Sequence, residues 1–168
     1  MDGENTTIYN DGYLHARSID GNSHPSRNWI KSTIVPKLMF NMDNDLRICG
    51  ENLYAKHSLE YNKLDSYFYM FSIWLNDTCL SWDFTEDYAR YFDLTLVPVM
   101  YKGILSEKII DTILKEIDLN VQEGFVIRRT CEIQIDQFST HVAKYVRKNH
   151  VTTDQHWAHQ EIIPNSLK

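Results

Sequence analysis

The chain has 168 residues and a mass of 19.9 kDa, and 43% of its residues are hydrophobic; this suits one compact domain with a sizeable core and excludes a disordered chain. No apolar run approaches the length of a membrane span, and the polar, acidic start carries no secretory signal, so we expect a cytoplasmic protein without a membrane partner. The formal net charge of −6 argues against broad, non-specific nucleic-acid binding, which depends on many lysine and arginine contacts to phosphate, but it leaves room for a local basic groove.

The chain begins with a predicted hairpin. Strands at residues 6–9 and 13–17 flank Asn10-Asp11-Gly12, and an Asp-Gly pair tolerates the positive φ of a tight turn. Residues 23–26 then open a helix that continues towards Leu38, although Pro36 is expected to bend it or end it early.

The middle of the chain is rich in strands. After a short strand at residues 47–51, residues 66–75 form a long aromatic and apolar run that predicts a buried strand. A turn at residues 76–77 leads into a second strand at residues 79–82. Asp83 fits the start of a helix, because an acceptor at the cap is followed three residues later by a glutamate.

The last third predicts one helix and two strands. Ser106 caps an amphipathic helix, and strands follow at residues 125–129 and 141–146. Strand pairs interspersed with helices indicate an α+β fold with mainly antiparallel sheet. The chain has no repeat, linker or low-complexity stretch, so we expect a single domain over residues 1–168.

Cysteines and histidines do not predict a metal site. The cysteines are widely spaced and read as reduced, mostly buried thiols: Cys49, Cys79 and Cys131. Three histidines near the end lack the spacing of a closed zinc site, and we interpret them as surface or phosphate-contacting residues: His150, His156 and His159.

Four residues at or near strands supply the chemical groups that nucleotidyl transfer requires. The reaction needs a ribose hydrogen-bond acceptor, an aromatic face for the base, a carboxylate near a divalent metal and a cation near the α-phosphate. Glu51, Phe71, Glu123 and Lys144 provide one group each. Taken singly, most such residues in proteins are solvated surface or core residues, so the four become informative only in combination.

That combination comes from four motifs in the correct order. Met1-Asp2-Gly3-Glu4-Asn5, Gly50-Glu51-Asn52, Glu123-Gly124-Phe125 and the run from 142 to 148 resemble motifs I, III, IV and V of the covalent nucleotidyltransferases. The likeness is to the ATP-dependent RNA ligases in particular, and it covers most of the chain. It implies the nucleotidyltransferase fold of an adenylation domain, ATP-grasp-like, with mainly antiparallel sheets flanked by helices.

The resemblance also implies roles for residues of the first half. Asp2 and Gly3 match the end of motif I and bind the nucleotide, and Asn5 matches an asparagine near the reacting phosphates. Arg17 matches the motif Ia arginine that contacts the nucleotide and the transferred phosphate. Glu51 matches the motif III glutamate that accepts a hydrogen bond from the ribose hydroxyl.

Further roles follow for three later residues. Phe71 matches the motif IIIa aromatic residue that stacks on adenine. Glu123 matches the motif IV carboxylate that helps to place Mg²⁺ or Mn²⁺. Lys144 matches the motif V lysine that contacts the α-phosphate. The predicted catalytic set is therefore Asn5, Arg17, Glu123 and Lys144.

Three positions depart from the family pattern. Motif I of the family reads Lys-x-Asp-Gly, so the nucleophilic lysine would fall one residue before Met1, and we expect the domain as given to be N-terminally incomplete. Ser72 stands where relatives usually carry aspartate. Val146 stands at the second lysine of motif V, a charge that Arg147 or Lys148 is expected to supply.

The predicted function is ATP-dependent joining of RNA 5′-phosphate and 3′-hydroxyl ends through enzyme–AMP and RNA-adenylate intermediates, on single-stranded or nicked RNA. Two alternatives stay open: a non-catalytic remnant that binds nucleotide or RNA, and an interaction domain that never binds ATP. A DNA ligase is a weaker alternative of the same class. The aromatic run at residues 67–74 is also typical of an RNA-stacking platform, but a buried core strand is the preferred interpretation.

Overall fold

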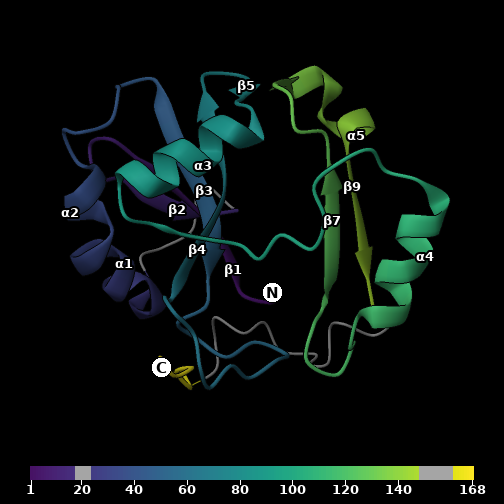
Figure 1. Ribbon diagram of the computed structural model, residues 1–168. Helices are drawn as coiled ribbons and strands as arrows, with labels where there is room; N and C mark the ends of the chain where they lie inside the picture. The colour runs from purple at the N-terminus through teal and green to yellow at the C-terminus, as the bar shows by residue number, and fades with distance from the viewer. Residues whose placement is uncertain (18–23, 148–160) are drawn as a thin grey trace.

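The computed structural model describes residues 1–17, 24–147 and 161–168. Its largest element is a sheet, which we call the main sheet (Figure 1). The strands of the main sheet are β1 (Glu4–Tyr9), β2 (Leu14–Ala16), β3 (Leu46–Asn52), β4 (Phe68–Leu75), β5 (Thr78–Cys79), β6 (Thr95–Leu96) and β8 (Ile133–Gln134). Their order is β2-β1-β3-β4-β5-β8, and β6 pairs with β4 as the parallel neighbour in an otherwise antiparallel sheet.

A second, two-stranded sheet stands beside the main sheet, and we call it the ribbon. It consists of β7 (Gly124–Arg128) and β9 (Val142–Val146), which pair antiparallel along their full length. Figure 1 shows the N-terminal end of the chain between the main sheet and the ribbon. Mixed helices and mainly antiparallel sheets confirm the predicted α+β class.

Helices flank both sheets. The helical segments are η1 (Pro25–Arg27), α1 (Asn28–Thr33), α2 (Val35–Leu38), α3 (Trp82–Tyr91), α4 (Glu107–Glu116), η2 (Ile135–Gln137) and α5 (Phe138–His141). The predicted break near Pro36 is confirmed, because Pro36 lies in the first turn of α2 and α1 ends at Thr33. The predicted cap of α4 is also confirmed, since the Ser106 hydroxyl accepts a hydrogen bond from the Ile109 N–H.

The hairpin at the start of the chain forms as predicted. β1 and β2 pair with Thr6 opposite Ala16 and Ile8 opposite Leu14. Gly12 adopts φ 83°, a conformation that L side chains rarely adopt, so glycine suits this position in the turn.

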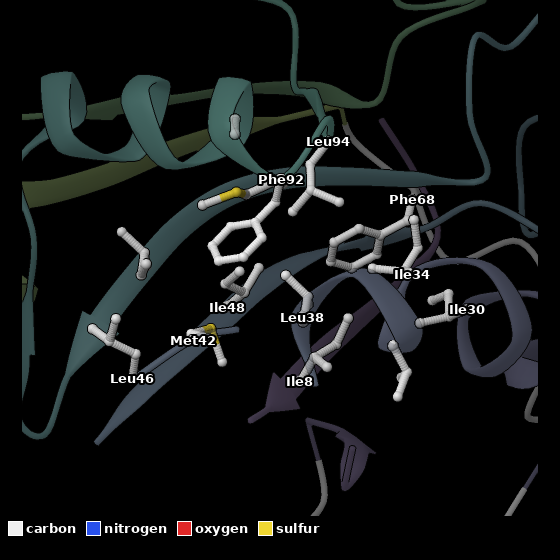
Figure 2. Close-up of a cluster of buried hydrophobic side chains, with 14 of the residues drawn as sticks. Ile8, Ile30, Ile34, Leu38, Met42, Leu46, Ile48, Phe68, Phe92 and Leu94 are labelled. Atoms are coloured by element: carbon white, nitrogen blue, oxygen red, sulfur yellow. The ribbon is translucent and has the colours of Figure 1, made fainter. Parts of the chain in front are cut away.

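The core lies between one face of the main sheet and helices α1, α2 and α3 (Figure 2). Ile8, Ile48 and Phe68 contribute from three neighbouring strands, and each is fully buried. Ile30 and Leu38 meet them from the helices and are also fully buried. We call this side of the main sheet the core face and the opposite side the site face.

A β-bulge changes the alternation of β4. Cys49 pairs with Ser72 and Gly50 pairs with Met70, so Phe71 is the extra residue of the bulge. A bulge places two successive side chains on one side of a sheet. Phe71 packs against the buried cluster that contains Cys49 and Trp74, and the Trp74 indole N–H donates to the Ser72 hydroxyl at 3.1 Å. Phe71 and Ser72 therefore both belong to the site face.

Two predictions of local structure need correction. The predicted strand at residues 79–82 ends at Cys79, and the helix starts at Trp82. Ser81 is its cap, because the Ser81 hydroxyl accepts from the Phe84 N–H; Asp83 lies inside the first turn. The prediction of mostly buried, reduced thiols is confirmed, because Cys49 and Cys79 are buried, Cys131 is exposed, and all three are free. His150, His156 and His159 lie outside the described residues.

Candidate functional site

The site face brings two of the predicted site residues side by side. Asn5 of β1 pairs directly with Glu51 of β3. Strand alternation puts both on the side opposite Ile8 and Ile48, which belong to the core. Asn5 is exposed and Glu51 is partly buried, so the pair lies where the sheet surface is open.

The segment before β1 is tied to Glu51 and to the loop that follows β3. The Gly3 N–H donates to Glu51 Oε1 at 2.9 Å. Asp2 Oδ2 accepts from the backbone N–H groups of Ser58 and Leu59 at 2.9 and 3.1 Å, and from the Ser58 hydroxyl. The Asp2 N–H donates to the Tyr61 hydroxyl at 2.9 Å. Asp2 and Gly3 are thus fixed beside Glu51 by contacts far apart in sequence.

The carboxyl group of Glu51 has an unusual protonation equilibrium. Burial raises its pKa from 4.5 to about 7. The hydrogen bond from the Gly3 N–H has a smaller, opposite effect on the pKa, because it favours the charged form. The negative charges of Glu123 and Asp2 act in the same direction as burial. Burial also raises the pKa of the Tyr61 hydroxyl, and the carboxylates of Asp2, Glu123 and Glu51 add to that shift. Three carboxyl groups therefore act electrostatically on one another at this place.

Lys144 occupies the middle of the ribbon. It pairs with Val126, and the same side of the ribbon carries Arg128 and Val142, which also pair. Val142 packs against the site-face cluster of Cys49 and Trp74, so this side is turned towards the main sheet. Lys144 is exposed on that side. The other side holds the stacked rings of Phe125 and Tyr145, 5.3 Å apart.

Glu123 and Arg147 lie at one end of the ribbon. The Arg147 N–H donates to the Glu123 carbonyl oxygen at 2.9 Å, next to the pair of Gly124 and Val146. The negative charge of Glu123 acts on Glu51 and Tyr61 and helps to raise the pKa of both groups. Glu123 therefore contributes to the electrostatics of the site face.

The predicted residues are spread over two groups of elements. The first group belongs to the main sheet or to segments next to its strands: Asp2, Gly3, Asn5, Arg17, Glu51 and Phe71. In the second group, Lys144 lies in the ribbon and Glu123 directly precedes β7. Arg17 follows β2 and is exposed; since Ala16 pairs with Thr6, the same register would bring Arg17 opposite Asn5. Phe71 is half-buried on the site face.

Sequence reasoning missed Ser58, Tyr61 and Arg128. Ser58 and Tyr61 hold Asp2 but are 56 and 59 residues away from it, so no local pattern connects them. The Arg128 guanidinium donates to the Phe71 carbonyl oxygen, so Arg128 lies on the side of the ribbon that is turned towards the main sheet. Arg129 instead contacts His141 at 3.1 Å.

The part of the chain that the structure describes contains no group of three or more histidine, cysteine or acidic side chains that could hold a metal ion. Mg²⁺ commonly binds through one or two carboxylates together with substrate phosphates and waters. The negative charge of Glu123 raises the pKa of Glu51, and a cation bound between these two groups would offset that repulsion.

Comparison with known proteins gives one match. The model of the RNA ligase family matches residues 1–146. A search of curated proteins and a search of solved structures each found nothing that matches. None of the helices among the described residues is long and apolar enough to cross a membrane. The family match covers most of the chain, including every predicted site residue, and the chain therefore belongs to the RNA ligase family.

Proposed function

We propose that this protein is an ATP-dependent RNA ligase that joins RNA 5′-phosphate and 3′-hydroxyl ends through enzyme–AMP and RNA-adenylate intermediates. The observation that carries the proposal is the convergence of two surfaces. Asn5, Glu51 and Phe71 share the site face of the main sheet, and the ribbon turns the side that bears Lys144 towards it.

Each side chain of this arrangement suits one part of ATP. The half-buried ring of Phe71 offers a flat face on which adenine can stack. Glu51 offers a carboxylate oxygen for the ribose hydroxyl, while its other contact, the Gly3 N–H, fixes its position. Lys144 is exposed and brings positive charge for the α-phosphate.

Glu123 is the residue that we propose for Mg²⁺ or Mn²⁺. A bound divalent ion would neutralise phosphate charge during the displacement. Glu123 would orient that ion, and its main chain is held by the Arg147 N–H. Asn5 and Arg17 would hold the phosphates from the side of β1 and β2.

The nucleophile of the first step would be the lysine with which motif I of the family begins. Its amine would attack the α-phosphorus as pyrophosphate leaves, and the AMP would then pass to an RNA 5′-phosphate. In the last step the 3′-hydroxyl oxygen attacks the 5′-phosphorus, the bond to AMP breaks, and the hydroxyl proton passes to solvent. No lysine is covalently involved in that last step.

Because the last step needs no covalent lysine, it can be tested on the chain as given. With pre-adenylylated RNA, a 3′-hydroxyl acceptor, Mg²⁺ and no ATP, we expect a sealed strand and free AMP, observed on a denaturing gel. Lys144→Met should slow sealing by about tenfold or more, equivalent to ~1.4 kcal/mol, because a cation is removed from the reacting phosphate. Lys115→Met is the matched control, since Lys115 is exposed at the end of α4, and it should leave the rate unchanged.

The outcomes separate the proposed ligase from its alternatives. ATP binding without sealing would favour a nucleotide-binding module without catalytic activity. If neither this chain nor a version with a lysine added before Met1 binds ATP or seals RNA, the result would favour an interaction domain. Mass spectrometry of that lengthened version with ATP and Mg²⁺ should show one added AMP.

A further inference from the structure

Two arginines attach the ribbon to the main body of the protein at opposite ends. Arg128 is the last residue of β7. Its guanidinium donates to the Phe71 carbonyl oxygen at 3.3 Å and to the Leu80 carbonyl oxygen at 3.1 Å. It also lies over the Trp82 ring, 5.8 Å from the centroid. One side chain thus connects the ribbon to β4, to the segment before α3, and to α3 itself.

Arg147 makes the equivalent connection at the other end. It follows β9, and its guanidinium donates to the Ser58 hydroxyl at 3.1 Å and to the Leu119 carbonyl oxygen at 3.3 Å. The same Ser58 hydroxyl donates to Asp2. Arg147 therefore links the ribbon to the loop that holds the N-terminal segment of the site.

Lys144 lies midway between these two attachments. In the ribbon Gly124 pairs with Val146 at the Arg147 end, Arg128 pairs with Val142 at the other, and Val126 pairs with Lys144 at the centre. β7 and β9 pair with each other and with no other strand among the described residues. A two-stranded sheet is at best marginally stable by itself, so its position depends on contacts such as those of the arginines.

We propose that Arg128 and Arg147 are positioning residues that bracket the ribbon and so set the distance of Lys144 from the nucleotide on the site face. The inference rests on the proposed function, because it takes ATP as the ligand that Lys144 meets. A shift of about 1 Å at a reacting group is enough to lower rates by two orders of magnitude, so a ribbon held at one end is expected to bind phosphate poorly.

The geometry separates this role from direct phosphate binding. Two N–H groups of the Arg147 guanidinium donate to Ser58 and Leu119, and its buried Nε has no hydrogen-bond partner among the described residues. The Arg128 guanidinium donates to the carbonyl oxygens of Phe71, Leu80 and Arg129. Both arginines therefore have structural acceptors at the ends of the ribbon, whereas Lys144 is exposed at its centre. Arg147 is accordingly assigned to positioning and not to the second cation of motif V; Lys148 lies outside the described residues.

The test is a set of ATP dissociation constants, measured by calorimetry with Mg²⁺ for the unmodified chain and for Arg128→Gln, Arg147→Gln and Lys144→Met. We expect each arginine variant to weaken binding by about fivefold or more. The decisive measurement is the double variants. If the arginines act by placing Lys144, adding either change to Lys144→Met should cause no further loss.

Arg129→Gln is the matched control. Arg129 is the neighbouring arginine, but it is exposed and contacts His141, so its loss should leave ATP affinity unchanged. Amide hydrogen exchange gives an independent readout: residues 124–128 and 142–146 should exchange faster in the Arg128 and Arg147 variants than in the Arg129 variant. Arg128→Lys and Arg147→Lys serve if the glutamine variants do not fold.

The outcomes distinguish this inference from the proposed function. Full additivity in the double variants, or unchanged exchange in the ribbon, would overturn the positioning role while ATP binding itself stands. The positioning role would also be overturned if Lys144→Met loses ATP affinity while neither arginine variant does. An unmodified chain that neither binds ATP nor seals adenylylated RNA would overturn both.

Discussion

Arg27→Met is expected to destabilise the protein by about 3–5 kcal/mol, because it leaves a buried carboxylate without its cation. Arg27 Nε and Nη2 donate to Glu4 Oε1 and Oε2, each at 2.7 Å, in a two-pronged ion pair. The side chains are only 6% and 5% exposed, so water cannot replace the lost partner. Thr6 would remain as a neutral donor to the carboxylate at 3.0 Å.

Urea unfolding followed by circular dichroism measures this loss. A domain of this kind typically has a total stability of about 5–15 kcal/mol, so the single variant should lie close to the unfolding threshold. The double variant Glu4→Leu with Arg27→Met should recover much of the loss, because an apolar pair removes the desolvation cost of both charges. A single variant within 1 kcal/mol of the unmodified chain would contradict the expectation.

The position of this ion pair explains why it matters for the site. Glu4 lies between Gly3 and Asn5 and points to the core face. Arg27 belongs to η1, so the pair fastens β1 to the segment that begins the helical layer. β1 in turn carries Asn5 opposite Glu51. The pair therefore fixes, from the core face, the strand that presents Asn5 on the site face.

Glu51→Gln is expected to stabilise the protein at pH 8 by about 2–3 kcal/mol and to have little effect near pH 4. The folded-state pKa of Glu51 is raised from 4.5 to about 7, mainly by burial. Between these two values the folded state binds more protons than the unfolded state. Stability therefore falls as pH rises from about 4.5 to about 7, and glutamine removes that loss.

Unfolding curves at pH 4, 6 and 8 for both forms test this pH dependence. The glutamine side chain retains an oxygen that can accept from the Gly3 N–H, so the hydrogen bond at this position is kept. Glu116→Gln is the control, because Glu116 is exposed on α4 and should give the same small difference at every pH. A constant difference for Glu51→Gln across the three pH values would contradict the prediction.

The same substitution should weaken ATP binding under the proposed function. The glutamine amide lacks the negative charge that strengthens the hydrogen bond from a ribose hydroxyl. A gain in stability at pH 8 together with a loss of ATP affinity would identify Glu51 as a residue kept for binding at the expense of stability. A gain in stability without any change in affinity would count against its role at the ribose.

Local signals were reliable where one residue decides the outcome. The Asp-Gly turn at Gly12, the break near Pro36 and the Ser106 cap all depend on backbone preferences of the residues themselves. The long run before Leu75 forms β4 because its composition suits burial in a sheet.

Local sequence patterns failed to predict the structure where two nearby residues suit the same role or where contacts from distant segments decide. Ser81 and Asp83 both suit a helix cap, and the structure selects Ser81. The backbone N–H of Trp82 donates to the Thr130 carbonyl oxygen at 2.8 Å. Thr130 lies far away in the sequence, so no local pattern predicts this contact. The bulge at Phe71 is another case, because simple alternation would put Ser72 on the core face.

The sequence by itself determined the residue types of the site, the order of the motifs and, through them, membership of the RNA ligase family. Only the tertiary structure decided which side chains meet. Gly3 reaches Glu51 across 48 positions, and Arg147 reaches Ser58 across 89. The physical reason is that such contacts depend on strand register and bulges, where a shift of one residue turns a side chain to the opposite face.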